Sequence, residues 1–149
     1  MNGLRGYISS RRFRGERVPQ HVQNLVVRDF CNRADMPYLL SAVEYRMPNC
    51  FMVLNQVLNE LDRIGGIVMY SMFQLPDAVD ESLHICDTVV RANRKLCFAV
   101  ESLTIEKQSD IYRVLDILNI ERTMASKATL KDIARSGEDA VPKSYRHAD

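Results

Sequence analysis

The stretch LRGYISSRRFRGERVPQHVQNLVVRDFCNR, residues 4–33, decides the fold expected for this chain. It opens with a short apolar run, Leu4 to Ser10, which predicts a β-strand. A loop rich in arginine follows, and Pro19 suits the first turn of a helix that begins near Val18 and ends near Arg33. Spacing of i, i+3 and i+4 predicts the residues on the inner face of this helix: Val22, Leu25, Val26 and Phe30.

The same order of strand and helix continues along the chain. Further strands are expected at 38–45 (YLLSAVEY), 67–70 (IVMY) and 96–100 (LCFAV). The run IVMY has no polar alternation, which is typical of a central parallel strand covered on both faces. These strands therefore alternate regularly with helical segments.

Three more helices are expected between and after these strands. Asn49 is a plausible N-cap for the second helix, which the Gly65-Gly66 pair closes. The third helix follows Pro76, and a fourth contains Ile111. The predicted inward residues are Phe51, Leu54, Leu58 and Leu61 in the second helix, Val79, Leu83, Cys86 and Val90 in the third, and Ile111, Leu115 and Leu118 in the fourth.

This alternation predicts an α/β fold. We expect a single doubly wound parallel sheet of about four strands, flavodoxin-like or resolvase-like, with helices on both faces. The α/β domain is expected to span residues 1–122. Apolar density falls after Ala125, so residues 123–149 are expected to form a partly helical, loosely ordered tail, with Leu130 and Ile133 lining a short extra helix.

Composition indicates a soluble protein. A chain of 149 residues with 46% hydrophobic residues can bury one core and is too short for two ordinary domains. No stretch reaches the roughly 18 apolar residues that a membrane span requires. The four cysteines show no CxxC or Cys/His spacing, which favours a reducing, cytoplasmic setting without a metal site or cofactor.

The candidate site follows from the sheet geometry. In open parallel sheets, ligands bind outside the carboxyl ends of the strands. The loop after the first strand, SSRRFRGER, brings guanidinium groups to this edge and leads into the N-terminus of a helix, which favours an anion. A phosphate or sugar-phosphate group fits such a loop. The residues expected to bind it are Ser9, Ser10, Arg11, Arg12, Arg14, Arg17, Gln20, Gln23, Tyr45 and Ser71.

Three further residues are candidates for catalysis. Glu44 and Glu101 each follow an apolar strand directly and could act as general base or acid, with His21 as a weaker candidate. Each also has a simpler interpretation. The arginines can be solvated surface charges, the glutamates can pair with a loop arginine, and a lone histidine is more often structural.

The sequence resembles two known families, and the first resemblance indicates a biological setting. Residues 3–105 resemble the sporadic carbohydrate cluster proteins, which occur in bacterial surface-polysaccharide gene clusters. The most specific parts are RVPQHVQN, residues 17–24, and LLSAVEY, residues 39–45. The resemblance implies a role in lipopolysaccharide O-antigen or capsule assembly, and it implies no particular reaction.

The second resemblance is to the catalytic domain of serine recombinases. GYISSR, VMYSMFQLPD and IERTMASKATLKDIARSG are similar to three of its motifs. In this alignment Ser9 replaces the first-strand arginine and Arg11 replaces the nucleophilic serine. The residues that stand in place of the third motif's aspartate and two arginines are Phe73, Gln74 and Asp77. The resemblance therefore implies a shared fold without the recombinase chemistry, which needs an activated serine.

Together these observations predict a protein of surface-polysaccharide biosynthesis that binds or modifies a sugar nucleotide or another phosphorylated sugar. A non-catalytic binding or regulatory module is one alternative, and a degenerate recombinase-like nucleic-acid protein is another. Nucleic acid is the less favoured partner because the basic residues gather in one loop. A homodimer that forms through residues 120–136 is also expected.

Overall fold

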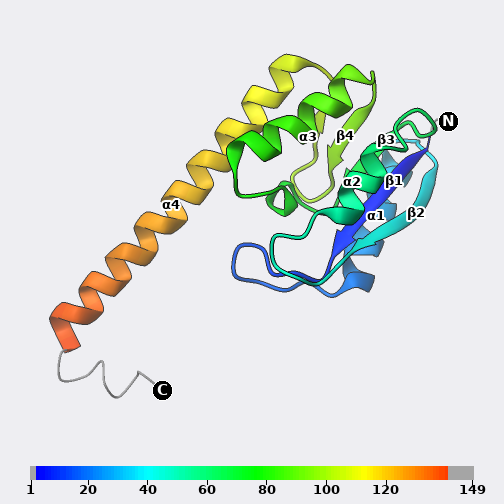
Figure 1. The fold of residues 1–149 in the computed structure, drawn as a ribbon. Helices are drawn as coiled ribbons and strands as arrows, with labels where there is room; N and C mark the ends of the chain where they lie inside the picture. Colours follow the sequence, from blue (N-terminus) through cyan, green and yellow to red (C-terminus); the bar gives the residue numbers. More distant parts are fainter. Residues whose placement is uncertain (1–2, 141–149) are drawn as a thin grey trace. The chain divides into compact units, whose positions relative to one another are not determined.

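The chain forms a five-stranded sheet with helices on both faces in a computed structural model, which describes residues 3–140 and the side chains of residues 3–127 (Figure 1). The elements are β1 (Leu4–Ser9), α1 (Gln20–Arg33), β2 (Tyr38–Glu44), α2 (Met52–Leu58), β3 (Gly66–Met69), the 3-10 helix η1 (Met72–Gln74), α3 (Val79–Arg91), β4 (Lys95–Phe98), β5 (Leu103–Ile105) and α4 (Gln108–Ala140).

The order of the strands is β2-β1-β3-β4-β5. The first four strands are parallel to one another, and β5 pairs antiparallel with β4. This confirms the predicted α/β fold with a mostly parallel sheet. The fifth strand was not predicted because its three residues, which follow a tight turn after β4, are too few to carry a strand pattern of their own.

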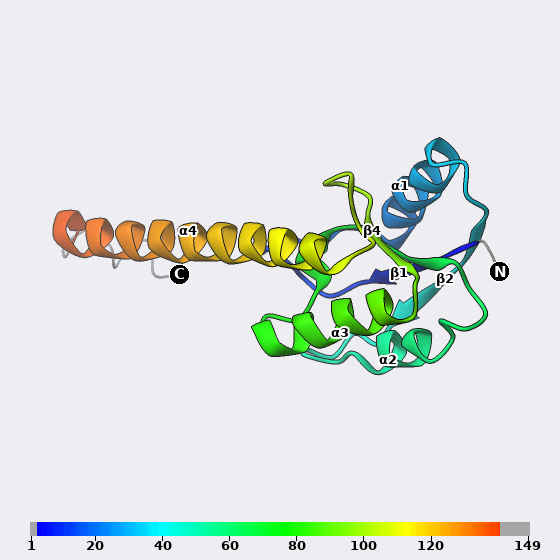
Figure 2. The ribbon, with the colours of Figure 1, turned by 90° about the horizontal axis from the view of Figure 1, so that it is seen from above.

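Helices cover both faces of the sheet. Figure 2 shows α1 on one face and α2 and α3 on the other. The core under α1 contains Leu4 and Ile8 of β1, Val27 and Cys31 of α1, and Val68 of β3. All four residues of β3 are buried, as expected for a central parallel strand.

The inner face of α1 differs from the prediction. The buried residues of the helix are Gln23, Val27 and Cys31, whereas Leu25 is 62% exposed and Val22, Val26 and Phe30 are only partly buried. The helix is rotated by about one residue because a glutamine occupies an inward position. The apolar pattern alone places the stripe incorrectly, since it counts Gln23 as an outward residue.

The buried stripe on α3 also differs from the prediction, by about one residue in the opposite direction, although Cys86 is buried as predicted. Val79 is exposed, and Leu83 and Val90 are only partly buried. The hydroxyl of Ser82 donates to the carbonyl oxygen of Pro76 at 2.6 Å, which lets a polar residue turn inward. The residues buried along this helix are Ser82, Ile85, Cys86 and Val89.

The prediction that Asn49 caps α2 is wrong. Asn49 is exposed and has a φ of 56°, and the residue at the N-cap position is Phe51. The helix ends at Leu58, so Leu61 and the Gly65-Gly66 pair lie beyond it. A carboxylate from the end of β2 caps this helix instead, which no local motif could indicate.

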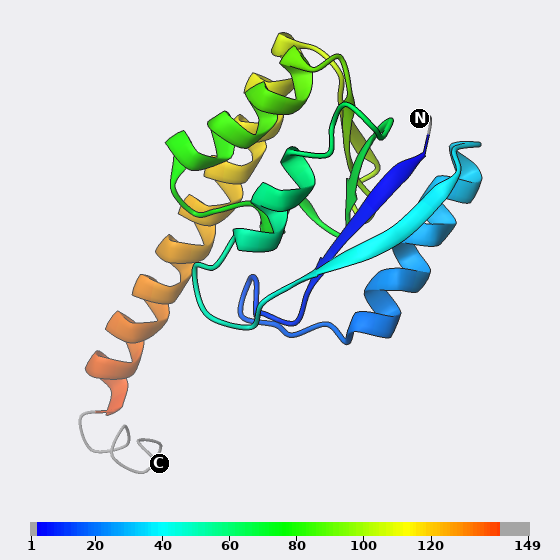
Figure 3. The ribbon, with the colours of Figure 1, turned by 45° about the vertical axis from the view of Figure 1, so that its right-hand side comes forward.

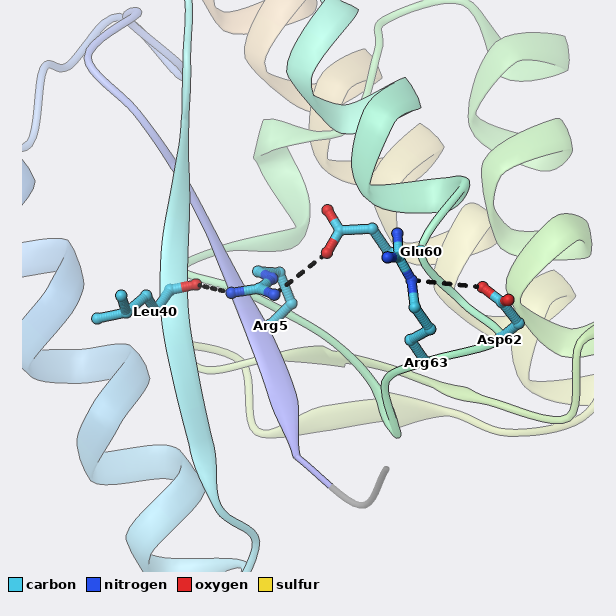
Figure 4. A network of polar contacts seen from close by, with 5 residues as sticks. All are labelled: Arg5, Leu40, Glu60, Asp62 and Arg63. Atoms are coloured by element: carbon cyan, nitrogen blue, oxygen red, sulfur yellow. Dashed lines mark hydrogen bonds and ion pairs between the residues drawn. The ribbon is translucent and has the colours of Figure 1, made fainter.

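Arg5 connects β1 to the elements beside it (Figure 4). Its guanidinium donates to the carbonyl oxygen of Leu40 at 2.8 Å and to the carboxylate of Glu60 at 3.1 Å. Leu40 lies where β2 bulges, since Arg5 pairs with Leu39 whereas Tyr7 pairs with Ala42. The arginine thereby binds a carbonyl group at the bulge and links β1, β2 and the turn after α2. A second contact in the same view, between Arg63 and Asp62, is long at 3.9 Å and exposed.

The chain divides between Leu115 and Asp116 into two compact units, and each is described by itself. The helix α4 begins in the first unit, where Ile111, Val114 and Leu115 are buried. The predicted boundary after residue 122 stays a prediction, and residues 141–149 of the predicted tail lie outside the described residues. Across residues 3–140, none of the helices has the length and apolar character that crossing a bilayer demands.

Candidate functional site

The candidate site lies at the switch point of the sheet, where the connections after β1 and β2 place the next strands on opposite sides of β1. From β1 the chain crosses to β2 on one side, whereas β3 lies on the other side of β1. Open α/β sheets bind ligands at this switch point, outside the carboxyl ends of the strands. Two segments leave the sheet there: the loop at residues 10–17, which we call the arginine loop, and η1. Figure 3 shows the arginine loop at the same end of the sheet as the loop after β2.

The arginine loop contains a tight hairpin. The backbone N–H of Phe13 donates to the carbonyl oxygen of Glu16 at 2.9 Å, and the reverse bond measures 3.1 Å. The two central residues, Arg14 and Gly15, have φ angles of 54° and 74°. Two consecutive positive φ values define a type I′ turn, the form that suits a two-residue hairpin. The loop therefore has a defined backbone.

Aromatic rings hold this hairpin against the domain. The guanidinium of Arg11 lies 4.2 Å from the ring centre of Phe51, and that of Arg14 lies 4.3 Å from the ring of Phe73. The ring of Phe13 packs against that of Tyr70, with 5.9 Å between the ring centres. Cation–π contacts of this kind contribute about 0.5–2 kcal/mol each. Both sides of the loop are thus fixed.

The loop arginines divide into two groups. Arg11 donates to the carbonyl oxygen of Cys50 and, at 3.3 Å, to the hydroxyl of Tyr7. Arg11 and Arg14 therefore stabilise the fold through these contacts and their ring stacks. Arg12 and Arg17 are exposed, and neither makes a hydrogen bond or ion pair with any residue that the structure describes. These two cations are available to an anionic ligand.

Glu44 is a buried structural carboxylate. It is 3% exposed and accepts hydrogen bonds from the hydroxyl of Tyr7 at 2.9 Å and from the backbone N–H of Tyr45 at 3.1 Å. It also accepts from the N–H groups of Val53 at 3.0 Å and Leu54 at 3.1 Å, and so caps α2. A carboxylate offers about four acceptor sites, and these four donors occupy them.

Tyr7 remains a hydrogen-bond donor in this cluster. Burial is the main cause that raises the pKa of its hydroxyl far above the ordinary value of 10.0, and the negative charge of Glu44 raises it further. The positive charge of Arg11 acts in the opposite direction. The neutral phenol therefore bridges the guanidinium and the carboxylate.

Glu101 has a comparable role at the other side of the edge. Its carboxylate accepts from the hydroxyl of Ser71 at 2.7 Å and from the backbone N–H of Met72 at 2.9 Å. Glu101 is half-buried, unlike Glu44, and two donors leave it free acceptor sites. Its contacts stabilise the start of η1.

A chain of buried amides joins the two sides. Gln23 is fully buried; its side-chain oxygen accepts from the N–H of Ser9 at 3.2 Å, and its amide nitrogen donates to the carbonyl oxygens of Ser9 and Val18 at 2.6 and 2.9 Å. The amide of Gln74 donates to Gln23 at 2.9 Å and its oxygen accepts from the N–H of Ser71 at 3.3 Å. The end of β1 is thereby linked to η1, and through Ser71 to Glu101.

The predicted site residues therefore occupy three environments around one edge of the sheet. Four are buried: Ser9, Gln23, Glu44 and Ser71. Three are half-buried: Ser10, Arg11 and Glu101. Six are exposed: Arg12, Arg14, Arg17, Gln20, His21 and Tyr45. The structure brings them to the expected edge, and the buried members use their polar atoms for internal contacts.

Sequence reasoning missed several partners at this edge. Phe51 and Phe73 carry the arginine stacks, and nothing in their local sequence shows which cation will lie over them. A signal did exist for Gln74, because Ser71 and Gln74 form the Ser-x-x-Gln pattern of a capping box, which the structure contains. Among the side chains that the structure describes, no group of three or more metal-binding residues lies close together.

Two solved structures are similar to this chain. The first is a resolvase family site-specific recombinase from Streptococcus pneumoniae, with a TM-score of 0.56 and 10% identity over 91% of this chain and 99% of that chain. The second is the N-terminal catalytic domain of TP901-1 integrase, with a TM-score of 0.56 and 12% identity over 80% of this chain and 98% of that chain. No protein-family model and no curated protein matches the sequence. The fold is therefore resolvase-like, and identities this low carry no statement about activity.

Proposed function

We propose that the protein is a cytoplasmic, non-catalytic binding module for a phosphorylated sugar or sugar nucleotide in bacterial surface-polysaccharide biosynthesis. One observation carries the binding part: Arg12 and Arg17 are exposed cations with no hydrogen bond or ion pair to a described residue, on a loop that aromatic contacts hold at the switch point of the sheet. The polysaccharide setting rests on the resemblance of residues 3–105 to the carbohydrate cluster family.

The geometry favours binding over proton transfer. Glu44 is surrounded by donors, so it has no free acceptor site for a substrate proton. Glu101 retains free acceptor sites and is the better placed of the two carboxylates for chemistry, and His21 is exposed in the first turn of α1. A catalytic role for these three residues stays a prediction that turnover assays can test.

Isothermal titration calorimetry against a panel of sugar nucleotides tests the proposal. Charge-assisted hydrogen bonds contribute roughly 1.5–3 kcal/mol each, so Arg12→Ala with Arg17→Ala should weaken binding by roughly 3–6 kcal/mol. Stability should change little, because both side chains are exposed and neither makes a hydrogen bond or ion pair with a described residue. Arg63→Ala is the matched control, since Arg63 is exposed before β3, at the amino edge of the sheet.

Substitution by lysine sharpens the test. Lysine keeps the charge but lacks the planar fork that contacts two phosphate oxygens, so Arg12→Lys with Arg17→Lys should recover only part of the affinity. Wild-type affinity in the double alanine variant for every phosphorylated sugar that the native protein binds would refute the proposed site. Turnover of a bound sugar nucleotide would instead restore the enzyme interpretation.

The fold supports a second candidate. The two similar structures are a site-specific recombinase and the catalytic domain of an integrase, so duplex DNA is a reasonable alternative ligand for the exposed arginines. Electrostatic binding to DNA falls steeply with salt. Strong, salt-dependent binding to a duplex, with no binding to sugar nucleotides, would favour this candidate.

A further inference from the structure

We infer that the carboxyl edge of β1 and β2 docks on an anionic lipid bilayer. The docking surface consists of the arginine loop, residues 10–17, and the loop at residues 45–52, which runs from the end of β2 into α2. This inference goes beyond the proposed function, although both use Arg12 and Arg17. Two of its apolar members, Met47 and Met52, have no part in the proposed phosphate site.

The two loops form one continuous surface. Arg11 of the arginine loop donates to the carbonyl oxygen of Cys50, and its guanidinium stacks on the ring of Phe51 at 4.2 Å. Glu44 holds both ends of the second loop, since its carboxylate accepts from the backbone N–H group of Tyr45 at the start of the loop and from that of Val53 just after it. Both loops leave the same end of the sheet in Figure 3.

Large apolar side chains lie uncovered on the second loop. Tyr45, Met47 and Met52 are 51%, 57% and 57% exposed, and they occur within eight consecutive residues. Methionine is flexible and adapts to irregular apolar surroundings, and tyrosine suits an interface because one end of its ring is polar. Such side chains can enter the boundary between lipid headgroups and acyl chains without a membrane span.

The charge of the same surface identifies the partner. Residues 10–17 and 45–52 contain five arginines and a single acidic residue, Glu16. Arg12, Arg17 and Arg46 are exposed, with no ion pair to any described residue. Basic residues near a bilayer are attracted to anionic lipids. A second copy of this chain fits less well, because a two-fold contact would bring the same arginines together.

Sedimentation with vesicles tests the inference. The full chain should bind vesicles of phosphatidylglycerol and phosphatidylcholine, bind vesicles of phosphatidylcholine alone much less, and be released by salt. Met47→Ser with Met52→Ser should lower the vesicle affinity by about tenfold or more, because the variant loses the apolar side chains that would leave water at the bilayer surface. Leu25→Ser is the matched control, since Leu25 is equally exposed but lies on α1.

Titration with sugar nucleotides separates this inference from the proposed function. The double methionine variant should bind them as the native protein does, whereas Arg12→Ala with Arg17→Ala should lower both kinds of binding. No sedimentation with anionic vesicles at low salt would overturn the docking surface, and so would unchanged sedimentation of the methionine variant. Binding to duplex DNA without binding to vesicles would also overturn it, and would assign the arginines to nucleic acid.

Discussion

Replacement of Glu44 by glutamine tests whether this residue is structural. The carboxylate oxygens each accept from two O–H or N–H donors: Tyr7 and Leu54 on one, Tyr45 and Val53 on the other. The thiol of Cys50 lies 3.8 Å from the second oxygen as a weaker donor. A glutamine has one oxygen, so its NH₂ group must face one of these pairs in either orientation. In the better orientation, the hydroxyl of Tyr7 can turn to accept from the amide, but it loses its own acceptor and the N–H of Leu54 stays unpaired. A buried donor without a partner costs roughly 1–3 kcal/mol, which predicts a loss of roughly 2–6 kcal/mol in the free energy of unfolding.

Urea denaturation measures this loss directly. With an m-value of roughly 2 kcal/mol/M, the midpoint for Glu44→Gln should fall by roughly 1–3 M. Glu101→Gln is the comparison, because its amide can donate to the hydroxyl of Ser71 while its oxygen keeps the N–H of Met72. That variant should lose less than about 1 kcal/mol. Equal midpoints for the two variants would refute this account of Glu44 as the cap of α2.

Three other outcomes are expected. Gln23→Leu should lower the free energy of unfolding, measured in urea, by several kcal/mol, because it leaves the buried backbone groups that bind this amide without a partner. A loss below about 1 kcal/mol would contradict the role of this network. Burial raises the pKa of Cys97 to about 11 and that of Cys86 to about 12, from 9.0. The unfolded chain loses these protons first, so stability should fall as the pH rises above about 9, by about 1.4 kcal/mol per pH unit for each thiol, and Cys97→Ala should reduce this slope between pH 8 and pH 10.5. Residues 120–136 should support a homodimer, and a monomer by light scattering at micromolar concentration would remove that prediction.

The sequence predicts the topology because strand and helix alternate along it. Continuous apolar runs such as 67–70 mark central parallel strands, and the rule for carboxyl edges then selects the edge at which the candidate site is proposed. The faces of α1 and α3 could not be predicted, because Gln23 and Ser82 turn inward once distant or local acceptors satisfy them. Polarity along the chain says nothing about such pairing.

The roles of the residues at the carboxyl edge of the sheet were difficult to predict for the same reason. Glu44 is 37 residues from Tyr7 and ten from Leu54, and Gln74 is 51 residues from Gln23. Whether a carboxylate after a strand is free for chemistry or surrounded by donors depends on segments that only the fold brings together. The exposed arginines were easier to identify, since a polar loop after a strand reaches the surface in most folds.

The type I′ hairpin of the arginine loop has a thermodynamic consequence. Arg14 occupies a left-handed conformation that costs a non-glycine residue about 1 kcal/mol, and the stack on Phe73 and the Phe13–Tyr70 contact maintain it. The loop therefore loses its conformational entropy when the chain folds, before any ligand arrives. A ligand that binds Arg12 and Arg17 has to order only two side chains, so preorganisation of the backbone should let even a small anion bind without a coupled folding step.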